Sequence, residues 1–359
     1  MRPHSTDRLA AWFHTQLPHA DAVRIEGLET VELGHSAETL LLTVVSHLDS
    51  TETRQDVVVR LHPTGPGLLP PYNLKRQFDV LHALEGTAVL APRGLWHEPT
   101  GNVLGREFYV MERIDGEVYE QTIPDGIEAD PDKLRTMCLG IVEQFAAIHL
   151  VDLQATGLHA LADGTTFLDR ELDHWESEIR RVQRGPLPAL ERLLAEVRAR
   201  KPEPCPRVTL IHGDAKPGNV GFDGARVTAV YDWESATVGD PLSDIGWLEL
   251  LWGFPVGLPN VLGAPTIDEA VAYYEQLSGI STQHRAWYRG FQGLKMAVIN
   301  LVGSMLFESG DSNDTRFAMM GYSVHWLTQR MLAEFDIHEE IEPGPVTPSP
   351  ERMATITPA

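Results

Sequence analysis

The hydrophobic pattern of this chain changes near residue 113, and that change limits the folds open to it. Residues 22–113 hold short aliphatic and β-branched runs separated by turn residues, with the sequences AVRIEGLETVEL, TLLLTVV, DVVVRLH and REFYVMERI. Such runs are typical of strands. One helix is expected over residues 72–84, because Leu74, Phe78, Leu81 and Leu84 share one face. We therefore expect a small sheet with one packed helix.

The rest of the chain has mainly helical periodicity. Residues 131–150 place Leu134, Ile141 and Phe145 on one face, and Pro131 suits a first helical turn. Further helical patterns cover residues 168–182, 189–200 and 267–334, and a β-rich insert lies at 208–232. Residues 338–359 are rich in Pro, Thr and acid, so a loose or extended tail is expected there.

Charge and composition exclude several classes of partner. The formal net charge of −22 and the lack of a Lys/Arg-dense run argue against binding to nucleic acid or to an anionic membrane. We find no signal-peptide core and no run of about 18 apolar residues, so a cytoplasmic protein is expected. Cys138 and Cys205 are too few for a disulfide framework, and reduced thiols are expected. The oligomeric state is left open.

The segment at residues 208–247 carries the chemistry. An apolar run ends at His212-Gly213-Asp214, which puts Asp214 on a loop leaving a buried strand. Asn219 follows, and a turn at Asp223-Gly224 leads into a second apolar run that ends at Asp232. The resulting hairpin brings Asn219 close to Asp232, so that an amide oxygen and a carboxylate can share one Mg²⁺ ion. Asp214 would lie beside the metal and be free to accept a proton.

These residues resemble a known family. Asp214-x-Lys216-x-x-Asn219, followed by a strand-ending Asp232, is similar to the catalytic and metal-binding loops of protein kinases. His212-Gly213-Asp214, Asp232-Trp233-Glu234 and Gly239-Asp240-Pro241-x-x-Asp244 resemble the aminoglycoside phosphotransferase and choline kinase branch. The resemblance covers about residues 25–330 and implies an α+β, bilobal, protein-kinase-like fold. Residues 1–113 would form an antiparallel-sheet, nucleotide-binding lobe with one helix. Residues 114–337 would form a mainly helical lobe, followed by the tail at 338–359.

The resemblance implies ATP- and Mg²⁺-dependent transfer of a phosphoryl group to a hydroxyl of a small molecule. Asp214 would be the catalytic base or orient the acceptor hydroxyl. Asn219 and Asp232 would be the Mg²⁺ ligands, and Lys216 a catalytic cation near the transferred phosphate. A solvated turn residue is the alternative for Lys216.

Four neighbouring residues have structural interpretations beside these. Asp240 precedes Pro and an apolar helix, so helix capping is the favoured role. Asp244 is expected to brace the catalytic loop. His212 is expected to hydrogen-bond the loop backbone rather than to move protons, and Glu234 either reaches the metal or faces water.

The first lobe departs from the kinase pattern in its phosphate-binding pair. Arg60 and Gln77 stand where a strand Lys and a helix Glu are usual. Arg60 can still contact phosphate, and the Gln77 carbonyl can accept a bond from it, although this pairing has one neutral partner. The alternative for Arg60 is an edge-strand residue that extends into solvent.

Further nucleotide contacts are expected from two segments. Gly34 and Ser36 lie in a turn that resembles a reduced phosphate-covering loop, for which an ordinary hairpin is the alternative. Met111, Glu112 and Ile114 lie where the family presents backbone groups to adenine, although core packing explains the apolar members equally well.

The sequence says least about the identity of the acceptor. Excess acid around residues 112–132 suits a polycationic aminoglycoside, but surface acid for solubility explains it as well. The aromatic residues in the last part of the chain are more typical of a hydrophobic core than of a cage for a quaternary amine. Sugars, hydroxy acids, macrolides and other alcohols remain possible acceptors. Two rival functions are a catalytically silent kinase-like binding protein, suggested by Arg60 and Gln77, and a metal-dependent hydrolase, for which further ligands are missing.

Overall fold

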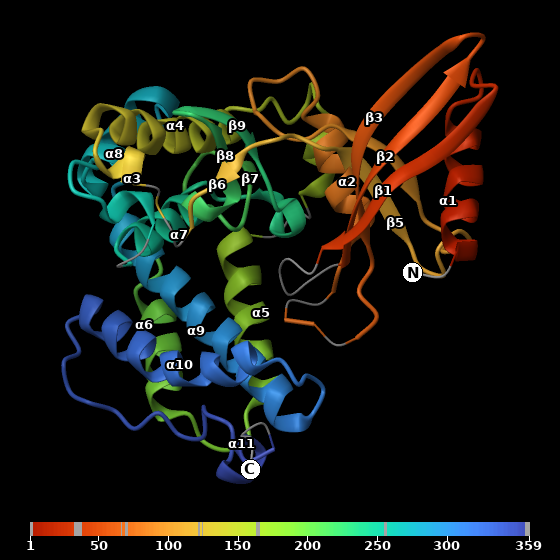
Figure 1. The fold of residues 1–359 in the computed structure, drawn as a ribbon. Coiled ribbons are helices and arrows are strands. Elements are labelled where there is room, and N and C mark those ends of the chain that lie inside the picture. Colours follow the sequence, from red (N-terminus) through yellow and green to blue (C-terminus); the bar gives the residue numbers. More distant parts are fainter. Residues whose placement is uncertain are drawn as a thin grey trace.

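The amino-terminal part of the chain is a five-stranded antiparallel sheet with a helix on each face (Figure 1). The structure is a computed structural model that describes residues 3–31, 38–65, 67–68, 71–120, 123, 125–162, 166–254 and 257–355. The strand order is β1-β2-β3-β5-β4. The strands are β1 (Ala22–Val31), β2 (Glu38–Leu48), β3 (Thr51–Leu61), β4 (Gly94–Glu98) and β5 (Phe108–Glu112).

Strand alternation decides which side chains of this sheet face the rest of the molecule. Val57 and Val59 of β3 pack with Phe108 of β5 against the amino-terminal helix α1 (Pro3–Gln16). Because successive side chains of a strand point to opposite faces, Arg60 and its cross-strand partner Tyr109 lie on the other face. That face carries α2 (Leu74–Ala83), which begins after the N-cap Asn73.

Helix α1 is a feature that the hydrophobic pattern does not predict. Its two fully buried side chains, Leu9 and Phe13, pack into the sheet core, and Trp12 makes an edge-on contact with Phe108. Asp7 and Arg8 before this stripe and His14 after it interrupt the apolar pattern. The helix depends on tertiary packing more than on its own propensity.

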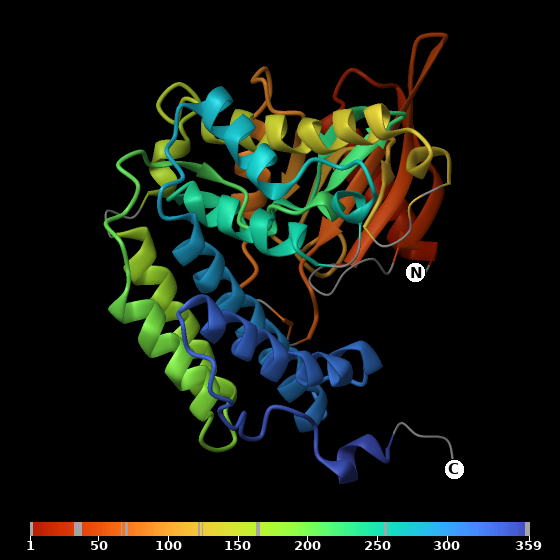
Figure 2. The ribbon, with the colours of Figure 1, turned by 90° about the vertical axis from the view of Figure 1, so that its left-hand side faces the viewer.

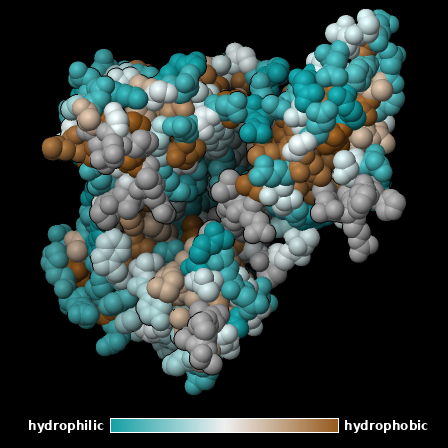
Figure 3. All heavy atoms as spheres, in the orientation of Figure 1, coloured by the Kyte–Doolittle hydropathy of each residue, from teal (hydrophilic) through white to brown (hydrophobic). Residues whose placement is uncertain are grey.

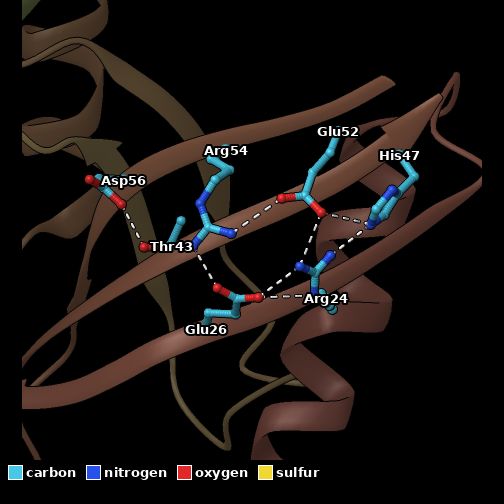
Figure 4. A network of polar contacts seen from close by, with 7 residues as sticks. All are labelled: Arg24, Glu26, Thr43, His47, Glu52, Arg54 and Asp56. Atoms are coloured by element: carbon cyan, nitrogen blue, oxygen red, sulfur yellow. Dashed lines mark hydrogen bonds and ion pairs between the residues drawn. The ribbon is translucent and has the colours of Figure 1, made fainter. Parts of the chain in front are cut away.

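An exposed ion-pair network lies on the same face of the sheet as α2, toward the far ends of β1, β2 and β3 (Figure 4). Arg54 lies 2.5 Å from Glu26, and Arg24 lies 3.2 Å from Glu52 and donates toward His47 at 2.6 Å. These side chains are more than a third exposed. Water screens such pairs, so they add little to stability and keep the protruding strands hydrophilic.

The carboxy-terminal region is mainly helical, and its helices form a layered pack below and beside the sheet (Figures 1 and 2). Helices α9 and α10 lie side by side, and α7 and α5 pack on α9. The helices are α3 (Asp125–Glu128), α4 (Pro131–His149), α5 (Phe167–Val182), α6 (Pro188–Ala199), α7 (Leu242–Trp252), α8 (Ile267–Ser278), α9 (Arg285–Ser309), α10 (Thr315–Glu334) and α11 (Pro350–Met353).

Helix α9 forms the centre of this pack. It has the length and the hydropathy of a membrane span, but 83% of its most apolar stretch is buried within the protein. Its buried side chains join a core that also includes residues of α4, α5, α7 and α10. The helix therefore serves here as a core helix.

Two small sheets position the segment that the sequence marks as functional. β7 (Thr209–Ile211) pairs with β10 (Thr237–Gly239), and β6 (Glu117–Val118), β8 (Val220–Asp223) and β9 (Arg226–Val230) form a three-stranded sheet. The hairpin expected between Asn219 and Asp232 is present as β8 and β9. The bilobal α+β architecture expected from the sequence is confirmed, with α1 as an addition.

The segment after α10 differs from the expected loose tail. Val346 is buried, and its carbonyl accepts a hydrogen bond from Ser304 of α9. Arg352 donates to the Phe307 carbonyl at 2.6 Å and lies over the Phe307 ring. Composition misses this because the segment binds through backbone groups and one Arg, which need no apolar pattern.

Candidate active site

A buried carboxylate holds the backbone of the loop that follows β7. Asp244 of α7 is 1% exposed, and it accepts hydrogen bonds from the backbone N–H groups of His212 at 2.7 Å and Gly213 at 2.8 Å. His149 of α4 lies 3.1 Å from the same carboxylate. The expected bracing role of Asp244 is confirmed, and the loop presents Asp214 in a fixed position.

The Asp214 carboxylate is held by neutral donors and lies near a cation. One oxygen accepts from Asn219 Nδ2 at 2.8 Å, the other accepts from Trp247 Nε1 at 2.8 Å, and Lys216 Nζ lies 3.6 Å away. Burial by itself would raise the pKa of Asp214, but Lys216 and the Asn219 hydrogen bond lower it below its usual value. Asp214 is therefore ionised near neutral pH. The sequence gives no signal for Trp247, which lies in the mostly apolar helix α7.

Lys216 is partly enclosed rather than a freely solvated turn residue. Its ammonium lies 3.3 Å from Glu120 as well as near Asp214, and its side chain is 28% exposed. Burial would lower the pKa of Lys216, but the two carboxylates raise it. The side chain thus stays a cation beside Asp214.

The β8–β9 hairpin brings Asn219 and Asp232 to the same end. The Tyr231 N–H donates to the Asn219 carbonyl at 2.8 Å, and Val220 pairs with Val230. Asp232 follows directly, with a backbone φ of 62° and ψ of 60°. This left-handed conformation is unusual for a residue other than glycine, and such strain is common at functional sites.

Arg60 faces these carboxylates from the sheet. Its guanidinium lies 3.6 Å from Asp232 and 3.8 Å from Glu234, and it donates to Thr39 Oγ1 at 3.2 Å. Arg60 is on β3, a central strand, and its side chain is only 15% exposed, so the edge-strand alternative is wrong. Glu234 turns toward Arg60, beside Asp232, rather than toward open water.

The expected pairing of Gln77 with Arg60 is not found among the described residues. Gln77 of α2 is buried, and its side-chain carbonyl accepts from the Tyr109 hydroxyl at 3.2 Å. Tyr109 lies directly opposite Arg60 in the sheet and occupies the space between them. Burial raises the pKa of Tyr109 to about 12, so it remains a neutral donor. Gln77 is therefore linked to Arg60 through Tyr109.

The other residues expected to contact the nucleotide differ in how close they lie to the Asp232 hairpin. The Ile114 carbonyl accepts from the Tyr231 hydroxyl at 3.2 Å, so this segment touches the residue before Asp232. Glu112 instead accepts from Arg93 at 3.0 Å. Met111 packs against the large core, which matches its structural alternative. Gly34 and Ser36 lie outside the described residues.

The expectation for His212 is confirmed, and that for Asp240 is met in part. His212 bonds to backbone, with its Nε2 2.8 Å from the Tyr231 carbonyl and its Nδ1 accepting from the Asp214 N–H at 3.3 Å. Asp240 lies one residue before Pro241, the N-cap of α7, and it accepts from the Leu242 N–H of the first helical turn at 3.0 Å, so it supports the start of the helix without being the N-cap residue itself. Its second oxygen accepts from the hydroxyl of Tyr288 at 2.6 Å.

An open cavity of about 440 Å³ lies against the loop that carries Asp214. Its walls come from α2, α5, α7 and α9, and Gly213 and Ser235 border it. The surface is hollowed between the sheet and the helical region in Figure 3. Arg76 and Lys295 line the cavity, and Lys295 donates to the Gly213 carbonyl at 2.7 Å. Sequence reasoning missed both, because helical spacing alone does not show which cations face a cavity.

Solved structures share this fold. A provisionally named aminoglycoside phosphotransferase from Ralstonia eutropha JMP134 superposes with a TM-score of 0.76 at 24% identity, covering 92% of this chain and 98% of that chain. Aminoglycoside phosphotransferase APH(4)-Ia, in a ternary complex with ADP and hygromycin B, gives a TM-score of 0.56 at 17% identity, covering 91% and 98%.

Curated relatives match the chain with only part of their own length. Acyl-CoA dehydrogenase family member 10 of Mus musculus is 28% identical over 284 residues, which is 74% of this chain and 26% of that protein. Acyl-CoA dehydrogenase family member 11 of Gallus gallus is 30% identical over 243 residues, which is 64% of this chain and 31% of that protein. The chain thus spans about a quarter to a third of these relatives.

The family model of the APH phosphotransferases matches residues 28–291, which include most of the sheet, the Asp214 loop and the Asp232 hairpin. This span is well over half of the chain and contains Asp214, Lys216, Asn219 and Asp232, although Lys295 lies just beyond it. The chain belongs to the APH phosphotransferase enzyme family and has its kinase-like fold.

Proposed function

We propose that this chain transfers the γ-phosphate of ATP, in a Mg²⁺-dependent reaction, to a hydroxyl group of a small molecule. The observation that carries the proposal is the convergence of Asp214, Lys216, Asn219 and Asp232, with Arg60, at one place between the sheet and the helical region. Phosphoryl transfer needs positioning and charge stabilisation more than covalent catalysis, and this cluster supplies both.

Asp214 would orient the acceptor hydroxyl and accept its proton as the bond to phosphorus forms. Its pKa lies below the usual value, so the carboxylate is ionised at neutral pH and binds the hydroxyl as an acceptor. Hydrogen bonds from Asn219 and Trp247 fix both oxygens. Lys216, next to Asp214, would stabilise charge on the transferred group.

Asn219 and Asp232 fit a magnesium ion. The Asn219 amide nitrogen is used in bonds to Asp214, which leaves its carbonyl oxygen as the ligand atom. One oxygen of Asp232 is buried and has no hydrogen-bond partner among the described residues. A carboxylate and an amide carbonyl are hard oxygen ligands, and Mg²⁺ bound there with ATP would neutralise phosphate charge.

Arg60 would take the place of the usual phosphate-binding lysine. Its guanidinium already faces Asp232 from the sheet side. Arginine holds its charge and can contact two phosphate oxygens at once, so this departure from the kinase pattern is compatible with nucleotide binding. Structures of APH(4)-Ia contain ADP or AMP-PNP, which supports nucleotide binding by a chain with this fold.

The test compares binding and turnover. With Mg²⁺ present, ATP should bind to the wild-type chain and be slowly converted to ADP, and a suitable acceptor should accelerate the conversion. Asp214→Ala should bind ATP and lose the conversion. A chain that binds Mg²⁺ and ATP but shows no conversion with any acceptor would be the silent binding protein. Binding of Zn²⁺ in place of Mg²⁺ and ATP would support the hydrolase. A cytoplasmic location stays a prediction.

A further inference from the structure

Lys295 joins the loop that carries Asp214 to two helices. It lies on α9, and its ammonium donates to the Gly213 carbonyl at 2.7 Å. The same ammonium lies 4.7 Å from the centre of the Trp247 ring on α7 and 5.8 Å from that of the Trp175 ring on α5. One cation therefore contacts three segments that are far apart in the chain.

The contact with Gly213 fixes the peptide group that precedes Asp214. Gly213 has a φ of 81°, a conformation that favours glycine. Its N–H donates to Asp244 at 2.8 Å, and its carbonyl accepts from Lys295. Both polar groups of Gly213 are thus held by charged side chains, one an acid and one a cation. A rotation of this peptide group would break a charge-assisted bond, and such bonds are stronger than those between neutral groups.

The contact with Trp247 acts on the carboxylate itself. The indole N–H of Trp247 donates to Asp214 Oδ1 at 2.8 Å, so the orientation of the ring decides where this oxygen lies. A cation over the face of an aromatic ring is attracted by the ring, and it draws electron density away from the N–H. Lys295 therefore holds the indole in place and makes its N–H a better donor toward Asp214.

Packing alone does not account for a lysine at this position. Lys295 is partly buried on a helix whose other side chains form the core, and burying a cation costs desolvation free energy. A methionine of similar length would fill the space between Trp175 and Trp247 without this cost, but it could not donate to the Gly213 carbonyl. The contacts that need the charge, with Gly213 and with the face of Trp247, both lead to Asp214.

We propose that Lys295 is a positioning residue for Asp214. It holds the peptide group before Asp214 through Gly213, and one carboxylate oxygen through Trp247, in the orientation that the acceptor hydroxyl needs. The inference rests on the proposed phosphotransferase function, and it adds a residue from beyond the segment 28–291 that the family model matches. Misplacing a reacting group by about 1 Å can lower a rate about 100-fold, so the loss of Lys295 should be seen in turnover.

The first experiment separates turnover from nucleotide binding. Conversion of ATP to ADP with Mg²⁺ gives kcat, and calorimetry gives the affinity for ATP. Lys295→Met keeps the approximate length of the side chain and removes its charge, so kcat should fall about tenfold or more. The affinity for ATP should stay within about twofold, because Lys295 acts on Asp214 and the proposed metal ligands are Asn219 and Asp232. Lys295→Arg keeps the charge and the contact with the ring, and it should restore most of the rate.

Trp247→Phe tests the route through the indole. The variant keeps an aromatic ring near the cation and removes the N–H that bonds Asp214, so kcat should again fall. Because Lys295 acts partly through this N–H, the loss caused by Trp247→Phe should be smaller in a chain that already carries Lys295→Met. Residues that act independently would instead give losses that multiply.

The second experiment needs neither ATP nor an acceptor. Hydrogen exchange of the Trp247 indole, identified as the signal that Trp247→Phe removes, reports on its bond to Asp214. Exchange should be about tenfold faster or more in Lys295→Met than in the wild type or in Lys295→Arg. The indole of Trp287, which donates to the Val197 carbonyl at 3.0 Å, is the internal reference. A general loss of stability would accelerate exchange at Trp287 as well.

Arg330→Met is the matched control. Arg330 also lies over an indole, 5.5 Å from the centre of the Trp326 ring, but on α10. The substitution removes a comparable contact between a cation and a ring on a different helix. Both kcat and the exchange of the Trp247 indole should therefore stay unchanged.

The inference fails if kcat of Lys295→Met lies within about twofold of the wild type, or if the affinity for ATP falls as far as kcat. It also fails if exchange accelerates equally at Trp247 and Trp287, or if Lys295→Arg is as impaired as Lys295→Met. A wild type that binds ATP with Mg²⁺ but forms no ADP would contradict the proposed transferase function by itself. The exchange experiment then decides whether Lys295 holds Asp214.

Discussion

Replacing Asp244 with Asn should remove the support of the loop that carries Asp214, with little change in side-chain shape. The carboxylate accepts the N–H groups of His212 and Gly213 with separate oxygens, and His149 approaches one of them. An Asn side chain has one oxygen and one NH₂ group. Whichever way the amide points, at least one backbone N–H then faces another donor.

The size of the effect follows from these contacts. A hydrogen bond to a charged group contributes about 1.5–3 kcal/mol, and the substitution removes the charge from all of the bonds and breaks at least one. Removing one partner from a buried ionic group costs about 3–5 kcal/mol in other proteins. We expect Asp244→Asn to lower the free energy of unfolding by about 3–5 kcal/mol at neutral pH.

The same contact predicts a pH dependence. Burial would raise the pKa of Asp244, but the bond from His149 and the backbone N–H bonds hold it below its usual value. A lowered pKa in the folded state stabilises the fold above the unfolded-state pKa of about 3.9, and this stability is lost as the pH falls through the folded-state value. The difference between wild type and Asp244→Asn should therefore be constant from neutral pH to about pH 4 and shrink below it.

Urea unfolding followed by tryptophan fluorescence, at several pH values, measures both effects. Asp223→Asn is the matched control, because Asp223 pairs with Arg226 at the surface and is 73% exposed. That exposed pair should contribute no more than about 1 kcal/mol. A loss of less than about 1 kcal/mol for Asp244→Asn, or a loss that does not depend on pH below 4, would refute the reasoning.

Three further substitutions test other contacts. Arg60→Gln should weaken binding of ATP with Mg²⁺ about tenfold or more, measured by calorimetry, because the guanidinium beside Asp232 is lost. Gly213→Ala should destabilise more than Gly224→Ala by thermal unfolding: both have positive φ, costing about 1–2 kcal/mol, but only at Gly213 would the new Cβ meet a backbone carbonyl at 2.5 Å. Arg352→Gln should lower the unfolding free energy by about 1–2 kcal/mol in urea if the carboxy-terminal segment is packed, and an unchanged value would indicate a loose tail.

The arrangement of the Asp214 loop and the hairpin after it could be predicted from the sequence because the residues that form it are close together in the chain. Asp214, Asn219 and Asp232 lie at the ends of short apolar runs, and a tight turn fixes the distance along the hairpin between them. Arg60 was identified by its place in the kinase pattern rather than by the strand pattern, and the structure puts its guanidinium 3.6 Å from Asp232. Residue type, spacing and period are enough where one hairpin brings the groups together.

Contacts between distant elements could not be predicted in this way. Tyr109 lies between Arg60 and Gln77 because β5 pairs with β3, and nothing in the local pattern gives that register. Lys295 binds the Gly213 carbonyl from a helix, 82 residues away along the chain. Helix periodicity shows an apolar face, but the partner of each polar side chain depends on the packing of α2, α5 and α9 together.

The most direct test of the account separates the role of Asp214, which is proposed to bind the acceptor hydroxyl, from that of Asp232, which is proposed to bind the metal. Calorimetric titration of ATP in the presence of Mg²⁺ is compared for wild type, Asp214→Asn and Asp232→Asn. We predict wild-type affinity in Asp214→Asn, with turnover lost, and an affinity at least tenfold lower in Asp232→Asn. An equal loss of nucleotide affinity in both variants, or full affinity in Asp232→Asn, would contradict the assignment.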